Sequence, residues 1–177
     1  MQKKSIYVAY TGGTIGMQRS DHGYIPVSGY MQKQLEQMPE FHRSEMPAFS
    51  IHEYCPLIDS SDMTPADWQR IADDIYANYD NYDGFVILHG TDTMAYTASA
   101  LSYLIQNSPK PIVITGAQKP IDLDVTDART NLLDSLRFAA SERAHGVTIV
   151  FDGKVIAGTR GKKERSKSYN AFSSINF

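Results

Sequence analysis

The sequence predicts an α/β domain with a doubly wound, mostly parallel sheet flanked by helices. Five short runs of β-branched and aromatic residues are almost continuously apolar, as expected for strands that are covered on both faces. Segments with helical periodicity lie between these runs, and strands that alternate with helices favour parallel pairing with right-handed crossovers. The chain of 177 residues is long enough for one domain with a sizeable core.

The predicted strands and helices alternate along the chain. The strands are residues 5–10, 49–54, 84–88, 111–115 and 147–151. Thr64 and Pro65 mark the start of a helix as N-cap and first-turn proline. Further helices are expected from Asp92, from Thr126 or Asp127, and over residues 29–38. Apolar residues on their inward faces are Trp68, Ile71, Ala72, Ile75 and Tyr79, then Met94, Ala98, Leu101, Leu104 and Ile105, then Leu132, Leu133, Leu136 and Ala140. Residues 39–47 are predicted to form a loop, and the basic segment 153–168 lacks helical periodicity.

Composition and charge exclude several classes of protein. The formal net charge of -3 gives no electrostatic reason to expect nucleic acid or an anionic membrane as partner. A single cysteine, Cys55, excludes an internal disulfide framework and a cysteine-rich metal site, which favours a cytoplasmic location. The first apolar run is too short for a signal peptide, and no stretch approaches the roughly 20 apolar residues that span a bilayer.

Polar clusters follow four of the predicted strands. They are Thr-Gly-Gly-Thr at 11–14, Asp-Ser-Ser-Asp at 59–62, His-Gly-Thr-Asp-Thr at 89–93 and Thr-Gly-Ala-Gln at 115–118. In open α/β sheets the ligand binds beyond the carboxyl ends of the strands. The sequence therefore predicts a site at this edge of the sheet.

The glycine pair at 12–13 permits a sharp turn with close approach to a ligand. The GxGxxG fingerprint and the Walker GK[ST] ending are both absent, so a nucleotide-binding domain is disfavoured. The hydroxyl of Thr14 is a candidate nucleophile, and a polar turn whose hydroxyls cap backbone groups is the alternative.

A threonine nucleophile needs a base, and two candidates remain open. One is His89, which could equally be structural, and the other is a lysine that burial keeps neutral. Asp92 could bind a substrate ammonium near a helix N-terminus, although one of residues 91–93 could simply cap that helix. Residues 59–62 could form a turn or grip a carboxylate, and the RGKKERSK segment could be a solvated loop or supply the lysine.

Taken together, YTGGTIG, GYIPV, DSSDM, LHGTDTM, ITGAQ and RGKK with NAFSSINF resemble the L-asparaginase family, in particular its bacterial type I, cytoplasmic branch. These motifs occur in the family's order along essentially the whole chain. TGGTI with HGTDTM about eighty residues later is highly specific.

The resemblance implies a role for each matching residue. Thr14 matches the nucleophile that attacks the side-chain amide of asparagine. Tyr24 matches the tyrosine on a flexible loop that closes over the substrate. Thr91, Asp92 and Lys163 match a second catalytic group that assists the threonine, with Lys162 as the neighbouring alternative to Lys163.

The remaining site residues bind the substrate. Asp59, Ser60 and Ser61 match the loop that holds its α-carboxylate, and Asp92 takes its α-amino group. Ala117 matches the position where a backbone group lies near the scissile amide. The residue Thr11 is expected to tie the loop to the end of the strand.

The implied reaction is hydrolysis of asparagine to aspartate and ammonia in two acyl-transfer steps, with no metal or organic cofactor. Family members form homo-oligomers, dimers or tetramers. They are about twice as long, with a smaller C-terminal domain that adds substrate contacts across a dimer interface. We therefore expect residues 1–177 to be a single N-terminal domain without that C-terminal domain, with weakened activity. An asparagine- or aspartate-binding module without catalysis is the alternative.

Overall fold

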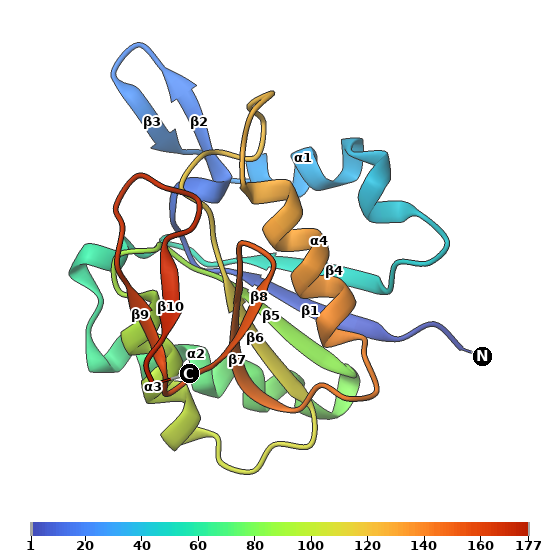
Figure 1. Ribbon diagram of the computed structural model, residues 1–177. Helices are drawn as coiled ribbons and strands as arrows, with labels where there is room; N and C mark the ends of the chain where they lie inside the picture. Colours follow the sequence, from blue (N-terminus) through green and yellow to red (C-terminus); the bar gives the residue numbers. More distant parts are fainter. Residues whose placement is uncertain (1, 177) are drawn as a thin grey trace.

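A six-stranded sheet with helices on both faces forms the centre of the computed structural model, which describes residues 2–176 (Figure 1). Its strands, in spatial order, are β4 (Ala48–Glu53), β1 (Ser5–Tyr10), β5 (Gly84–Leu88), β6 (Pro111–Thr115), β7 (Gly146–Phe151) and β8 (Lys154–Ala157). Neighbouring strands from β4 to β7 are parallel, and β8 is antiparallel to β7. The predicted α/β fold with a mostly parallel sheet is confirmed.

Four α-helices connect and cover the strands: α1 (Tyr30–Gln37), α2 (Pro65–Asn78), α3 (Met94–Leu104) and α4 (Ala128–Ala139). Thr64 begins α2 as predicted, because its side chain accepts the N–H of Asp67 while the Asp67 carboxylate accepts the N–H of Thr64. The alternative that one of residues 91–93 caps α3 holds for the position of Thr93 but not for a side-chain bond. Thr93 occupies the N-cap position without capping, because its hydroxyl donates instead to the carbonyl of Ser60, at 2.7 Å.

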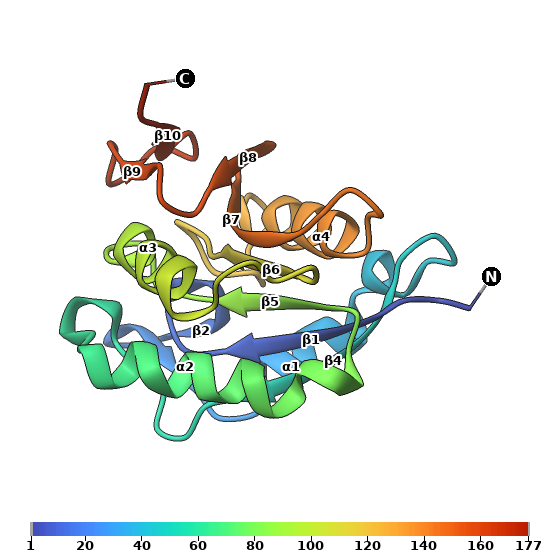
Figure 2. The same cartoon turned by 90° about the horizontal axis from the view of Figure 1, so that it is seen from below.

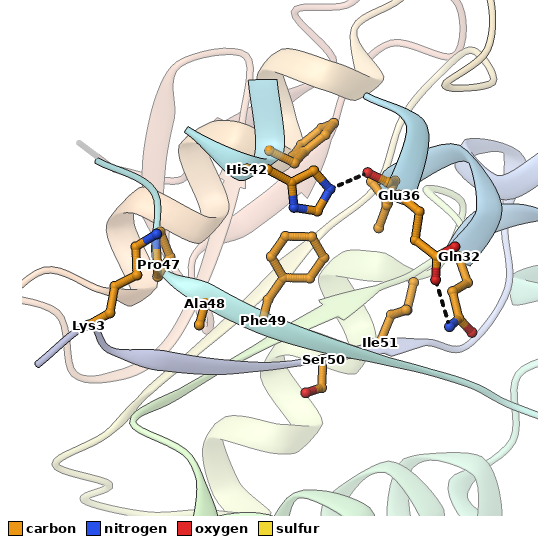
Figure 3. Close-up of a pocket in the computed structure, with 11 residues that line it drawn as sticks. Lys3, Gln32, Glu36, His42, Pro47, Ala48, Phe49, Ser50 and Ile51 are labelled. Atoms are coloured by element: carbon orange, nitrogen blue, oxygen red, sulfur yellow. Dashed lines mark hydrogen bonds between the residues drawn. The ribbon is translucent and has the colours of Figure 1, made fainter. Parts of the chain in front are cut away.

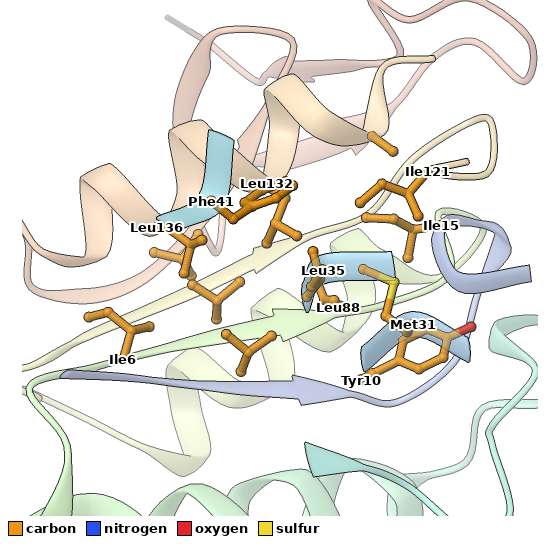
Figure 4. Close-up of a cluster of buried hydrophobic side chains, with 14 of the residues drawn as sticks. Ile6, Tyr10, Ile15, Met31, Leu35, Phe41, Leu88, Ile121, Leu132 and Leu136 are labelled. Atoms are coloured by element: carbon orange, nitrogen blue, oxygen red, sulfur yellow. The ribbon is translucent and has the colours of Figure 1, made fainter. Parts of the chain in front are cut away.

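Two hydrophobic layers lie on opposite faces of the sheet, between its strands and the helices that Figure 2 shows around it. Alternate residues of β1 point to opposite faces, so Ile6 and Val8 pack toward α1 and α4 while Tyr7 and Ala9 pack toward α2 and α3. Figure 4 shows the first layer, where Met31 and Leu35 of α1 and Leu132 and Leu136 of α4 meet the sheet. Leu104 is a correction to the predicted core, since it is 48% exposed at the end of α3.

The edge strand β8 and two small hairpins were not predicted. The strands β2 (Met17–Ser20) and β3 (Gly23–Pro26) pair antiparallel in a hairpin that projects away from the main sheet (Figure 1). The strands β9 (Gly161–Lys163) and β10 (Phe172–Ser174) pair across the basic segment. Their residues are mostly polar and solvent-facing, so they lack the apolar pattern that marks a buried strand.

None of the α-helices within residues 2–176 combines the length and the apolar character that crossing a membrane requires.

Candidate active site

A pocket of about 360 Å³ lies beyond the carboxyl ends of β4, β1, β5 and β6. These four strands are adjacent in the sheet, so the loops that follow them meet at one edge. The pocket is lined by Gly13, Thr14, Met17, Pro26, Leu57, Ile58, Asp59, Ser60, Gly90, Thr91, Asp92, Gln118, Lys163 and Ser166. Six of the residues proposed from sequence therefore line one cavity, at the predicted edge: Thr14, Asp59, Ser60, Thr91, Asp92 and Lys163.

Glycines allow these loops to approach each other at the distance of backbone contact. A Cβ on Gly12 would lie 2.1 Å from the carbonyl oxygen of Ile58. A Cβ on Gly13, which has φ of 98°, would lie 2.7 Å from Cα of Gly90. A Cβ on Gly90 would lie 2.3 Å from Oγ of Ser60. Any side chain at these positions would force the loops apart.

The two threonines that flank the glycine pair occupy different environments. Thr11 is 1% exposed, and its hydroxyl donates to the Leu88 carbonyl at 2.8 Å. It therefore ties the turn to the end of β5, as predicted. Thr14 is half-buried in a 3₁₀ turn (Thr14–Gly16) and lines the pocket.

A lysine, a threonine and an aspartate form a hydrogen-bonded group in the pocket wall. Nζ of Lys163 donates to Oγ1 of Thr91 at 2.7 Å and to Oδ1 of Asp92 at 3.1 Å. Lys163 is the last residue of β9, whose pairing with β10 carries it to the site from a distant part of the chain. Lys162 is exposed, so Lys163 is the lysine that the structure places at the pocket.

Gln118 connects this group to the following loop and was not among the proposed site residues. Its Nε2 donates to the carbonyls of Arg165 and Ser168, each at 3.2 Å. These two acceptors orient the amide, so Oε1 accepts the Thr91 hydroxyl, also at 3.2 Å. The Thr91 oxygen thus accepts from Lys163 and donates to Gln118. The Thr-Gly-Ala-Gln motif placed Gln118 at the strand end but did not reveal these contacts.

His89 is excluded as the base because it is fully buried and both ring nitrogens are engaged. Nδ1 lies 2.6 Å from the Gly90 carbonyl, which can only accept, so this nitrogen carries the proton. Nε2 therefore accepts from Thr97, whose hydroxyl in turn accepts from the indole of Trp68. Burial lowers the pKa of His89 to about 4. This histidine is neutral and structural.

The loop that follows β4 forms a local turn and also contributes to the wall of the pocket. The Asp59 carboxylate accepts the N–H of Ser61 at 2.9 Å and its hydroxyl at 2.8 Å, and these bonds lower the pKa of Asp59. Ser60 is 5% exposed and lies against Gly90. Asp59 and Ser60 line the pocket, whereas Ser61 is exposed outside it.

Tyr24 and Ala117 do not line the pocket. Tyr24 lies on β3 of the projecting hairpin and is 44% exposed. Ala117 is buried immediately beside Gln118. The hairpin leads into α1, where Tyr30 donates to Oδ2 of Asp122 at 2.7 Å, and burial followed by this bond raises the pKa of Tyr30 to about 12.

A second hollow, of about 530 Å³, lies between β4 and α1 and shares no lining residue with the first (Figure 3). Its histidine, His42, stacks on Phe49 and has Nε2 2.9 Å from the Leu35 carbonyl, so that nitrogen is a donor. The hydrogen-bonded lysine, threonine and aspartate belong to the first pocket. Within residues 2–176, no group of three or more His, Cys, Asp or Glu side chains is arranged to hold a metal ion.

A mostly parallel sheet with a threonine after a glycine pair and a lysine-linked Thr-Asp pair at its carboxyl edge has the arrangement of a candidate small-molecule site in an α/β protein. The chain belongs to the asparaginase family, because the family model described as asparaginase, N-terminal, matches residues 5–177.

Similar proteins cover the whole chain. It is 61% identical over 176 residues to L-asparaginase 1 of Escherichia coli strain K12, which covers 99% of this chain and 52% of that protein. The crystal structure of L-asparaginase I from Vibrio cholerae superposes with a TM-score of 0.92 at 59% identity, covering 99% of this chain and 52% of that one. The thermostable L-asparaginase from Thermococcus kodakarensis gives 0.85 at 39% identity, with 98% and 52% covered. The chain thus spans about half the length of these relatives.

Proposed function

We propose that this chain carries the catalytic pocket of an L-asparagine amidohydrolase, which hydrolyses asparagine to aspartate and ammonia with Thr14 as nucleophile. The observation that carries the proposal is the hydrogen-bonded group of Lys163, Thr91 and Asp92 in the pocket that Thr14 also lines. Family membership and relatives named L-asparaginase support the substrate.

The first step joins the substrate to the protein. Oγ1 of Thr14 attacks the side-chain amide carbon, and its proton passes to the amide nitrogen through the hydroxyl of Tyr24 or through the group of Lys163, Thr91 and Asp92. The tetrahedral intermediate expels ammonia, which leaves with that proton, and an ester between Thr14 and the aspartyl group remains. Backbone N–H groups at the strand-end turns would stabilise the oxyanion, each by about 3–4 kcal/mol.

The second step restores the free enzyme. Water attacks the ester carbonyl and loses a proton to the group of Lys163, Thr91 and Asp92. The ester C–O bond breaks, the Thr14 hydroxyl regains a proton, and aspartate leaves. The Thr91 hydroxyl donates its hydrogen to Gln118, so a lone pair of the Thr91 oxygen points toward Lys163.

Substrate groups are assigned from charge. Asp92 and the ionised Asp59 attract the α-ammonium group, because both carboxylates line the pocket. Two carboxylates cannot hydrogen-bond to each other without a proton, so the α-carboxylate is bound through the N–H and hydroxyl groups of Ser60, and by Ser61 once it exchanges its bonds to Asp59 for the substrate. Before that exchange, both Ser61 donors are held by Asp59. Ala117 contributes a backbone group beside the scissile amide.

Closure of the β2–β3 hairpin is part of this proposal. Tyr24 is exposed on that hairpin, so it must move toward the pocket to contact Thr14. The proposal has three further parts. The protein forms homo-oligomers, dimers or tetramers as in the family. A smaller C-terminal domain lies outside residues 1–177, and the protein is cytoplasmic. Light scattering of the purified protein measures the oligomeric state.

Ammonia release from asparagine, compared between the chain and Thr14→Ala, tests the function. We expect Thr14→Ala to abolish release, while Thr130→Ala, an exposed threonine on α4, leaves it unchanged. Release that survives in Thr14→Ala refutes the nucleophile. If the unsubstituted chain binds aspartate in calorimetry but releases no ammonia, the binding-module alternative holds.

A further inference from the structure

A buried carboxylate that the proposed chemistry leaves unused lies directly behind the pocket. Asp127 is 7% exposed and precedes α4. It makes no side-chain cap with that helix. Its carboxylate accepts the N–H of Gln118 at 2.9 Å and that of Lys119 at 3.1 Å. The described hydrogen bonds of this carboxylate therefore reach back to the loop that follows β6.

A side chain from within α4 holds the same loop. Asn131 is 1% exposed, and its Nδ2 donates to the Gly116 carbonyl at 2.9 Å. Its Oδ1 accepts the N–H of Asp152 at 3.0 Å, which ties the loop to the end of β7. The loop from Gly116 to Lys119 is thus fixed on α4 at both ends.

The bonds to Asp127 determine how two peptide planes face. The Ala117–Gln118 and Gln118–Lys119 bonds are trans, since the cis bond found in residues 2–176 is Cys55–Pro56. In a trans peptide the N–H and the C=O point in opposite directions. Because the N–H of Gln118 points at Asp127, the carbonyl of Ala117 points away from it.

We propose that Asp127 is a positioning residue for the amidohydrolase reaction, acting through the Ala117 backbone and the Gln118 side chain. This inference rests on the proposed function. Its physical basis is that two adjacent N–H donors need acceptor oxygens, which a carboxylate supplies on both sides. An asparagine would direct an NH₂ group at one of those donors. Bonds to a charged acceptor are also the stronger kind.

The experiment compares Asp127→Asn with Asp124→Asn, which removes an exposed carboxylate from the same loop. Amide hydrogen exchange measured by NMR reports the hydrogen bonds from the N–H groups of Gln118 and Lys119 to residue 127. The kcat and KM for asparagine report the effect of these bonds on the reaction. We expect faster exchange at Gln118 and Lys119 in Asp127→Asn, with kcat lowered about 10- to 100-fold and KM changed much less. Asp124→Asn should match the unsubstituted chain in every measurement.

Three results overturn the positioning role: unchanged exchange at both amides, unchanged kcat in a folded Asp127→Asn, or a lowered melting temperature with unchanged kcat and KM. If the unsubstituted chain releases no ammonia, its dissociation constant for aspartate replaces kcat, and we expect Asp127→Asn to weaken it about 10-fold. If Asp127→Asn does not fold, Asp127→Glu replaces it, and we expect protected amides with reduced kcat. Fast hydrogen exchange at the Gln118 and Lys119 amides in that variant contradicts the positioning role.

The positioning role and the proposed function fail separately. Activity that persists in Thr14→Ala refutes the threonine mechanism, while the exchange and aspartate-binding measurements still decide the role of Asp127. Loss of activity in Thr14→Ala with full activity in Asp127→Asn refutes only the positioning role.

Discussion

Replacing Gly90 with alanine tests the close approach of the strand-end loops. A Cβ at this position would lie 2.3 Å from Oγ and 2.6 Å from Cβ of Ser60. An ordinary contact between such atoms is about 3.5 Å, so one of the loops must move by roughly 1 Å. Ser60 is 5% exposed and its carbonyl accepts the Thr93 hydroxyl at 2.7 Å, so the serine has little freedom to yield.

The expected cost follows from that overlap. Overpacking of this kind destabilises by about 1–3 kcal/mol. For a chain of this size that corresponds to a fall in melting temperature of about 2–10 °C. Because Ser60 lines the pocket, the same displacement should weaken aspartate binding or lower kcat by about 100-fold. Urea denaturation measures the first effect, and calorimetry with ammonia release measures the second.

A second substitution separates the overlap from other effects of the alanine. Ser60→Gly removes both atoms that the new Cβ would meet, so Gly90→Ala in that background should cost less stability than it does alone. A Gly90→Ala variant within about 0.5 kcal/mol of the unsubstituted chain in stability, with unchanged binding, refutes the reasoning. So does an equal cost of Gly90→Ala in both backgrounds.

Three further outcomes are expected. Lys163→Met should lower kcat by about 100-fold or more. It should change stability by less than about 1 kcal/mol, because Asp92, the ion-pair partner of Lys163, is mostly exposed. Retained kcat contradicts the role assigned to Lys163. Tyr30→Phe should cost about 1–3 kcal/mol in urea denaturation, since it removes the bond to Asp122, whose other oxygen is buried without a hydrogen bond; Tyr76→Phe, 85% exposed, is the control and should cost nothing. Burial holds the pKa of His89 at about 4 against 6.5 unfolded, so the unfolded state takes up a proton first as pH falls; stability should drop by about 3 kcal/mol between pH 6.5 and 4, and an NMR titration of this ring near 6.5 would contradict it.

The central strands of the main sheet could be predicted because they are buried on both faces. β1, β5 and β6 are almost continuously apolar, and their observed bounds match the predicted ones. The two hairpins were missed because their strands are short and solvent-facing, so neither an apolar run nor strict alternation marks them. Leu104 was misplaced because helical periodicity does not say where a helix ends relative to the sheet.

Candidate site residues could be proposed from the sequence where polar residues follow the end of a predicted strand. Thr14, Thr91 and Asp92 follow apolar runs directly, and the rule that parallel strand ends meet at one edge brought them together. Lys163 was identified only through its family resemblance, because it arrives from a separate hairpin. The position of Asp127 in the sequence suggested a helix start, and neither Asp127 nor Asn131 gave a sign of contacts with the loop after β6.

The order of the central strands and helices and the sheet edge that carries the candidate site follow from local chemistry: apolar runs, glycine pairs and polar residues at strand ends. The family was recognised from the resemblance of the ordered motifs. Tertiary structure alone decided which lysine reaches the threonine and aspartate, that His89 is neutral, and that a buried carboxylate holds the loop beside the pocket. The reason is physical. Apolar periodicity depends on residues that are close together in the sequence. The partner of a hydrogen bond and the desolvation of a charge depend on groups that are distant along the chain.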